Sequence, residues 1–93
     1  MPIMRLAAKA VTKGVRKFFA QPNKVHKLLN VARHNLSGYT QKEAARLMQN
    51  TLAKGVYEAY QTVGSMVLAS TNSQVTYVFI DGVIAIGDMW IRN

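Results

Sequence analysis

Few side chains in this sequence could do chemistry, and their spacing does not bring them together. The chain has no cysteine, four acids and two histidines, His26 and His34. The histidines have no carboxylate close by in the sequence, so we interpret both as solvated side chains on a helix rather than as metal ligands. There is no glycine-rich phosphate loop either, so no set of residues for acid–base, nucleophilic or metal catalysis can be assembled. We therefore expect no cofactor, no bound metal and a protein that is not an enzyme.

Two of the acids lie in an otherwise apolar segment near the end of the chain. Residues 75–91, VTYVFIDGVIAIGDMWI, contain Asp81 and Asp88 and no other charged side chain. A helix of this length measures about 26 Å, which is at the short end of what crosses a bilayer. At about 100° per residue, Tyr77, Asp81, Ala85 and Asp88 fall on one side of that helix, and the other side is apolar. The spacing predicts a transmembrane helix with one side for lipid and one for protein.

The acids of this segment imply a partner. An aspartate near the centre of a bilayer costs about 2.5–3.5 kcal/mol on insertion scales, so it faces another helix, water or a countercharge. We expect Asp88 to pair with Arg92, one helical turn further on. Small residues would let a second helix approach. The residues predicted to pack against that helix are Tyr77, Asp81, Gly82, Ala85, Gly87 and Asp88.

The basic side chains are concentrated in the first part of the chain. Residues 1–54 hold eleven of the twelve Lys and Arg, and the first acid is Glu43. Such a segment is attracted to polyanions, either phosphate backbones or anionic lipid headgroups. If the partner is lipid, the residues expected to contact its headgroups are Lys9, Lys13, Arg16, Lys17, Lys24, Lys27, Arg33 and Arg92. Because most cations precede residues 75–91, the N-terminus is expected on the matrix or cytoplasmic side.

Helical patterns fill the remainder of the chain. Residues 1–36 are typical of two basic amphipathic helices separated at Pro22, and the first of them also resembles a mitochondrial targeting segment. The sequence TQKE at 40–43 matches a capping box and predicts a third amphipathic helix over residues 40–69. Whether that helix and the apolar segment form one bent helix or two stays open. We predict an all-α fold in which 1–93 is a single membrane-associated subunit, with amphipathic matrix-side helices followed by one C-terminal transmembrane helix over 75–91.

Several stretches together resemble the g subunit of the mitochondrial F-type ATP synthase. IGDMWIR at 86–92 is similar to the glycine and following acid in the transmembrane helix of that family. QPNKVHKLLNVARHNL resembles its proline-led matrix helix, YTQKEAARLMQNTL resembles a T-x-x-E helix start, and YQTVGSM is similar to a Q-T-G-S turn. The likeness covers residues 20–92 loosely. It departs from the family at Ile91, where a second glycine is expected, and in the placement of Asp81.

The resemblance implies a non-catalytic accessory subunit of the ATP synthase membrane sector, in a complex that synthesises ATP by proton-driven rotation. Such subunits pair with the small e subunit, support ATP synthase dimers and help to curve the membrane into cristae. The implied surroundings are the mitochondrial inner membrane, with the N-terminus in the matrix, and anionic lipids such as cardiolipin, with no nucleic acid as a partner. Two alternatives stay open. One is a basic organellar ribosomal or nucleic-acid-binding protein, which the charge of the first half fits, and the other is a single-span accessory subunit of another respiratory complex.

Overall fold

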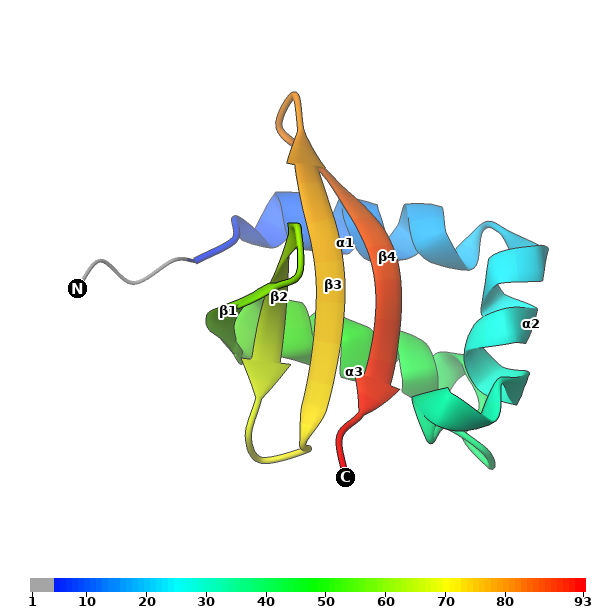
Figure 1. The fold of residues 1–93 in the computed structure, drawn as a ribbon. Coiled ribbons are helices and arrows are strands. Elements are labelled where there is room, and N and C mark those ends of the chain that lie inside the picture. The colour runs from blue at the N-terminus through cyan, green and yellow to red at the C-terminus, as the bar shows by residue number, and fades with distance from the viewer. Residues whose placement is uncertain (1–4) are drawn as a thin grey trace.

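The computed structural model describes residues 5–93 as a bundle of helices followed by a meander of strands. Its elements are α1 (Ala8–Phe19), α2 (Pro22–Asn30), the short 3-10 helix η1 (Ala32–His34), α3 (Gln41–Lys54), β1 (Val56–Tyr60), β2 (Val63–Leu68), β3 (Ser73–Ile80) and β4 (Val83–Ile91). The strands form one antiparallel sheet in the order β1-β2-β3-β4. α1 and α3 cover one face of this sheet, and α2 lies beyond the β4 edge (Figure 1). The described chain is therefore an α+β fold.

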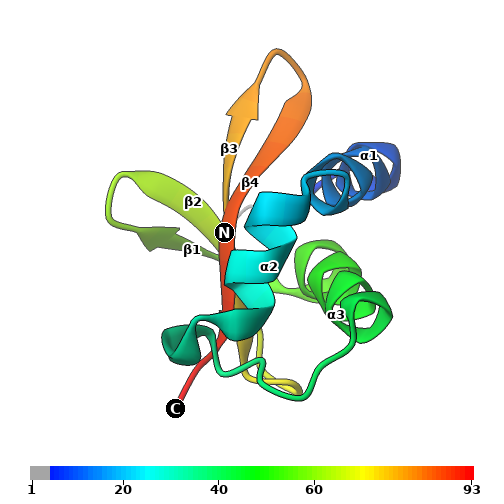
Figure 2. The same ribbon diagram turned by 90° about the vertical axis from the view of Figure 1, so that its right-hand side faces the viewer.

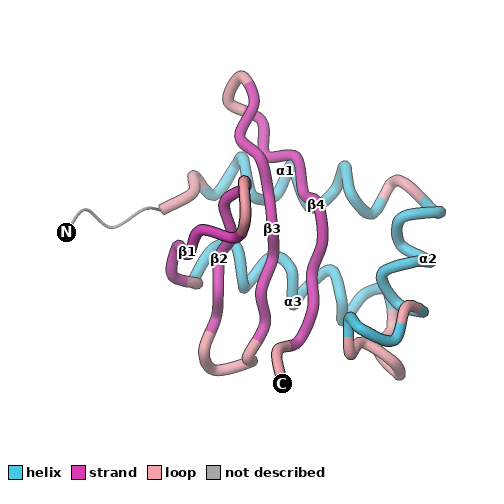
Figure 3. Tube along the Cα trace, in the orientation of Figure 1, coloured by secondary structure: helices cyan, strands magenta, loops and turns pink. Residues whose placement is uncertain are grey.

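The predicted all-α fold is wrong. The helix expected over residues 40–69 ends at Lys54, and the chain continues into β1 and β2. The segment 75–91, expected to be a transmembrane helix, forms most of β3 and the whole of β4 (Figure 3). β-branched and aromatic residues dominate this segment, and they favour a strand over a helix.

The turn between β3 and β4 shows why residues 75–91 do not continue as a helix. Only Asp81 and Gly82 separate the two strands. Both have left-handed backbone conformations, with φ of 51° and 74°, as the tight hairpin turn that matches strand twist requires. Asp-Gly meets this requirement with little strain. The two-residue turn therefore folds the apolar segment back on itself as a hairpin.

The membrane assignment fails with the predicted helix. Among residues 5–93, no helix is both long enough and apolar enough to cross a membrane. The expected location in the mitochondrial inner membrane, with the N-terminus in the matrix, depended on a span at 75–91 and is overturned.

The predicted start of the third helix is confirmed. The Thr40 hydroxyl accepts a hydrogen bond from the Glu43 amide at 3.1 Å, and the Glu43 carboxylate accepts one from the Thr40 amide at 3.0 Å. This reciprocal capping box begins α3. Pro22 occupies the first turn of α2, where its missing amide hydrogen costs nothing. Residues 1–4, the beginning of the helical range predicted for 1–36, lie outside the described residues.

The apolar sides of the helices pack onto the sheet. Val11 of α1, Met48 and Leu52 of α3, and Val75 and Met89 of the sheet are all fully buried. The apolar stripe of α1 is thus part of the protein core rather than a surface for lipid.

The approach of α1 to the sheet is close. A Cβ atom added to Gly14 of α1 would lie 2.9 Å from the carbonyl oxygen of Ile84 on β4. Real Cβ atoms do not approach carbonyl oxygens so closely, so glycine is required there. This contact holds α1 directly against β4.

Candidate functional site

The face of the sheet turned away from α1 and α3 carries polar and aromatic side chains from all four strands. Directly paired residues share a face, and the register pairs Glu58 with Ser65, Ser65 with Thr76, and Thr76 with Asp88. Alternation along the strands adds two aromatic residues and a glutamine to the same side. We call this surface the open face, and its polar and aromatic residues are Glu58, Tyr60, Ser65, Gln74, Thr76, Asp88 and Trp90.

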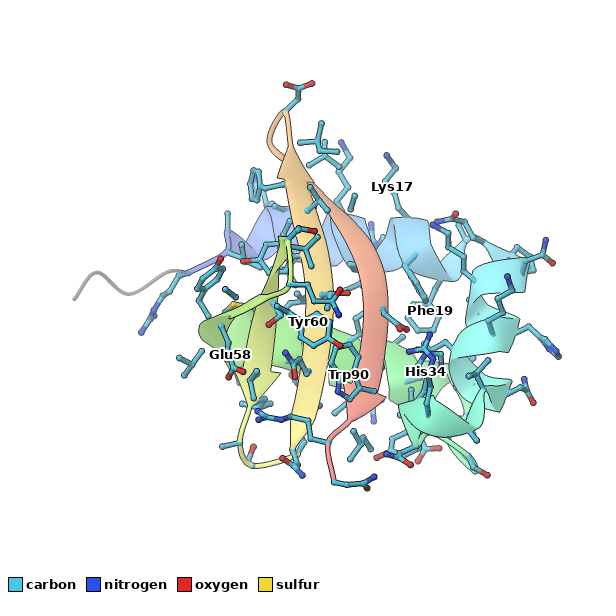
Figure 4. The ribbon with its side chains drawn as sticks, viewed as in Figure 1. Lys17, Phe19, His34, Glu58, Tyr60 and Trp90 are labelled. Atoms are coloured by element: carbon cyan, nitrogen blue, oxygen red, sulfur yellow. The ribbon has the colours of Figure 1, made fainter. Side chains whose placement is uncertain are left out.

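The open face is concave because the sheet is strongly curled. The hairpins β1–β2 and β3–β4 diverge when the sheet is seen from its side (Figure 2). Tyr60 and Trp90 come from the two edge strands, yet their rings meet in front of the sheet with centroids 5.0 Å apart (Figure 4). Arg92, which follows β4, also reaches across to β1. Its Nη1 lies 3.9 Å from Glu58 Oε2.

The hollow that results forms a pocket in front of the sheet. This sheet pocket has a volume of about 490 Å³. It is lined by Arg33, Tyr60, Gln61, Thr62, Val63, Thr76, Gly87, Asp88 and Trp90. Its walls therefore combine two aromatic rings, several hydroxyl or amide groups, one cation and one carboxylate.

A cluster of charged side chains forms the rim of the sheet pocket. The short helix η1 lies against β4 and brings Arg33 and His34 to Asp88. Arg33 Nη1 donates to Asp88 Oδ2 at 2.9 Å. His34 Nε2 lies 2.8 Å from Asp88 Oδ1. One carboxylate is thus held between two basic groups from a different element.

The surroundings of His34 define how its ring is held. The residue is only 3% exposed, and its Nδ1 lies 3.0 Å from the carbonyl oxygen of Leu28. A carbonyl only accepts, so Nδ1 is the donor in that hydrogen bond. The Nε2–Asp88 distance is that of an ion pair, but Nε2 has no well-aligned hydrogen-bond acceptor.

The second pocket lies on the other side of Arg33 and Asp88. This helix pocket has a volume of about 280 Å³. Its lining residues are Phe18, Lys24, Lys27, Leu28, Val31, Arg33, His34, Gly87 and Asp88. It shares Arg33, Gly87 and Asp88 with the sheet pocket, so the two hollows adjoin at the β4 edge.

The residues predicted to pack against a second helix do not form one surface. Tyr77 is buried on the side of the sheet that faces the helices, where burial, and next the nearby Tyr57, raise the pKa of its hydroxyl. Asp81 and Gly82 form the exposed turn of the β3–β4 hairpin. The remaining members of the predicted set, Ala85, Gly87 and Asp88, lie on β4.

The expected pairing of Asp88 with Arg92 is also wrong. Asp88 pairs with Arg33 and His34, and Arg92 lies beside Glu58 instead. In a helix Asp88 and Arg92 would lie one turn apart. A strand rises about 3.3 Å per residue, so four positions along a strand separate two residues by more than about ten ångströms.

The basic residues predicted to contact lipid headgroups divide into three groups. Lys9, Lys13, Arg16 and Lys17 are exposed on α1, and Lys17 points away from the sheet near the β3–β4 hairpin (Figure 4). Lys24, Lys27 and Arg33 line the helix pocket, and Arg92 is on the open face.

Sequence reasoning missed several residues of the site. His26 is exposed as predicted, but His34 is buried, so its interpretation as a solvated side chain is wrong. Glu58, Tyr60 and Thr76 were not singled out at all. The signals that could have found them are the Asp81–Gly82 turn and the polar and apolar alternation on the strands beside it.

The open face thus carries an aromatic pair above a concave sheet, and η1 beside it brings Arg33 and the buried His34 to Asp88, with additional cations along the β4 edge. In comparisons with protein-family models, curated proteins and solved structures, this chain finds no match.

Proposed function

We propose that this protein binds single-stranded nucleic acid on the open face of its sheet. The observation that carries the proposal is the meeting of Tyr60 and Trp90 over a pocket whose rim holds Arg33. Aromatic side chains stack on bases, and basic side chains neutralise phosphates. The chain carries a formal net charge of +8, so it attracts a polyanion over long distances.

The shape of the pocket favours a single strand over a duplex. A base reaches an aromatic ring inside a hollow only if it is unstacked and turned out of its own helix. The hydroxyl and amide groups of Thr62, Thr76 and Gln61 surround the same hollow, where they can bond to the edges of an unpaired base. A duplex keeps those edges paired.

This proposal follows one of the alternatives left open by the sequence and departs from the expectation that no nucleic acid is bound. The likeness to an ATP synthase subunit was centred on IGDMWIR as the end of a transmembrane helix. Those residues belong to β4 and the residue after it, which removes the structural support for that function.

The test uses the single tryptophan of the chain as its probe. We expect a single-stranded RNA or DNA of about ten nucleotides to quench the fluorescence of Trp90 in low salt, and the matched duplex to quench it much less. Trp90→Ala should weaken binding of a dye-labelled single strand by roughly 5- to 150-fold, which corresponds to about 1–3 kcal/mol for one stacked base. Phe79→Ala is the matched control, since Phe79 is 52% exposed and lies on the β3–β4 hairpin. Equal effects of the two variants would refute the assignment to the open face.

A specific observation favours a second function, the cleavage of bound RNA. Two of the four acids of the chain, Glu58 and Asp88, lie on the open face. A carboxylate weakens phosphate binding by repulsion, yet Asp88 lines the sheet pocket and Glu58 lies on the same face of the sheet, so we propose a further use for these acids. As a general base, either could take the proton of a ribose 2′-hydroxyl. The 2′-oxygen would then attack the adjacent phosphorus, the bond from phosphorus to the 5′-oxygen would break, and that oxygen would take up a proton from water or from the carboxyl group protonated in the first step.

Cleavage of this kind requires the 2′-hydroxyl and no metal ion. We therefore expect RNA, but not DNA of the same sequence, to be cut in the presence of a chelator and to leave a 2′,3′-cyclic phosphate. Glu58→Gln and Asp88→Asn identify the base, and Asp81→Asn, in the exposed turn, is the control. The same protein preparation is first shown to bind RNA by quenching of Trp90 fluorescence. If the RNA is still intact after long incubation with it, cleavage is excluded and binding is not.

A further inference from the structure

We infer that the bound strand runs from the sheet pocket across β4 into the helix pocket, so that one base lies against Trp90 and a neighbouring phosphate lies between Lys24, Lys27 and Arg33. This inference rests on the proposed binding of nucleic acid, and it adds the path of the strand and a phosphate site that the binding proposal does not contain.

The two pockets differ in charge, which assigns the base to one and the phosphate to the other. In the sheet pocket Arg33 faces Asp88, and the neighbouring Arg92 faces Glu58, so positive and negative charges balance. The helix pocket adds Lys24 and Lys27 to Arg33 and has Asp88 as its one carboxylate. The excess of cations there favours an anion, whereas the balanced, aromatic pocket favours an uncharged base.

The helix pocket also has the apolar floor that strengthens such an attraction. Phe18 and Leu28 are buried beneath it, 4% and 2% exposed. Charges beside an apolar wall are screened less than charges surrounded by water. A phosphate held between the exposed lysines would therefore be attracted more strongly than one on the open surface of α1.

Gly87 makes the passage between the pockets. It lies at the irregularity in the β3–β4 pairing next to Thr76, where β4 has one residue more than its partner. A β-bulge of this kind bends the strand and increases its twist. Gly87 lines both pockets, and a Cβ atom added to it would lie 3.0 Å from the Thr76 hydroxyl. Because glycine has no side chain, the surface between the two pockets is low beside the Arg33–Asp88 pair, and a sugar–phosphate chain can pass over it.

The test measures the affinity of the full chain for a series of ligands: a nucleoside, a dinucleotide, a short single strand and inorganic phosphate. The first variant is Lys24→Ala with Lys27→Ala, and its matched control is Lys9→Ala with Lys13→Ala, which removes two lysines from a separate hollow on α1. We expect the first variant to bind the dinucleotide and the short strand at least about tenfold more weakly and the nucleoside unchanged, because it lacks two of the cations that hold the phosphate. The control should weaken binding only by the general effect of two fewer charges.

Salt dependence provides an independent readout. The slope of log affinity against log salt for the short strand should become shallower by about 0.7 for each phosphate that the variant no longer neutralises. A change of this size in the first variant but not in the control supports the path.

Each remaining outcome overturns a defined part of the proposal. Equal weakening in the two double variants, or none, would show that the strand does not enter the helix pocket, while quenching of Trp90 would still support binding on the open face. Inorganic phosphate that binds as tightly as the dinucleotide would make the helix pocket a site for free phosphate. If no ligand quenches Trp90, the binding proposal itself fails.

Discussion

The rings of Tyr60 and Trp90 lie 5.0 Å apart although β1 and β4 are the two edges of the sheet. Side chains on opposite edges of a flat sheet of four strands do not meet, because neighbouring strands are about 4.8 Å apart. The contact therefore depends on the curl of the whole sheet. Both rings line the sheet pocket.

Removal of the Tyr60 ring should enlarge the sheet pocket, which this side chain lines. We expect Tyr60→Ala to lower the free energy of unfolding by about 0.5–1.5 kcal/mol beyond the effect of the buried area that it removes. It should also shift Trp90 fluorescence to longer wavelength, since the indole becomes more exposed to water. Denaturant titration followed by tryptophan emission measures both effects. The exposed Phe79, changed to alanine, is the control, and an unchanged emission maximum in Tyr60→Ala would mean that the two rings do not touch in solution.

Asp88 should matter for stability as well as for binding. Its side chain is 27% exposed, and its Oδ1 lies 2.8 Å from Nε2 of the nearly buried His34. Asp88→Asn removes that charge and weakens the bond from Arg33, so we expect the free energy of unfolding to fall by about 1–3 kcal/mol. Asp81→Asn, in the exposed turn, should change it by less than about 0.5 kcal/mol. Urea titrations of the two variants compare them directly, and equal values would show that the contacts of Asp88 with Arg33 and His34 contribute no stability.

A buried chain of hydroxyl groups joins α3 to the start of β3. Thr51 Oγ1 donates to the Leu47 carbonyl at 2.7 Å and lies 2.7 Å from the Ser73 hydroxyl, which in turn contacts Thr71. Thr51→Val keeps the shape but leaves Ser73 without this buried partner. We expect the free energy of unfolding to fall by about 1–3 kcal/mol in thermal or urea unfolding. Thr71→Ala, at the exposed end of the hydroxyl chain, should have a smaller effect, and a silent Thr51→Val would contradict the importance of this link.

The capping box makes stability depend on pH in the acidic range. Hydrogen bonds from the Thr40 backbone and side chain lower the pKa of Glu43 below its usual 4.5. The folded protein therefore favours the ionised carboxylate, whose contribution is present above pH 4.5 and is lost as the pH falls through the lower folded-state pKa. Unfolding measured at a series of acidic pH values should show this loss of stability in the natural chain and a smaller one in Glu43→Gln. Identical pH profiles would mean that the capping box does not form in solution.

Features that depend on neighbours in the chain could be predicted from the sequence. The Thr40–Glu43 box was identified because both partners lie within one helical turn, and the start of α3 followed from it. The helix of residues 8–19 was visible because its apolar residues recur with the helical period. The sequence did not show what this apolar stripe packs against, because a helix that lies on a membrane and a helix that packs on a sheet have the same apolar pattern.

The sequence of the apolar segment near the end of the chain is compatible with two structures, a helix and a hairpin, and the protein adopts the hairpin. Its length and two-sided pattern suited a helix, while its β-branched residues and the Asp81–Gly82 pair suited a hairpin. The sheet decides between them, because β2 supplies a hydrogen-bonded neighbour for β3 as far as Tyr77, and α1 and α3 cover the apolar side that the hairpin presents.

The candidate site itself was decided by tertiary structure alone. Arg33 and Asp88 are 55 positions apart in the sequence, and Tyr60 meets Trp90 only because the sheet curls. No local pattern encodes either contact. The sequence by itself determined the cationic first half, the capping box and the amphipathic helices, since these follow from composition and from residues a few positions apart. The packing of those helices on a curled sheet determined which of the remaining side chains came to share one pocket.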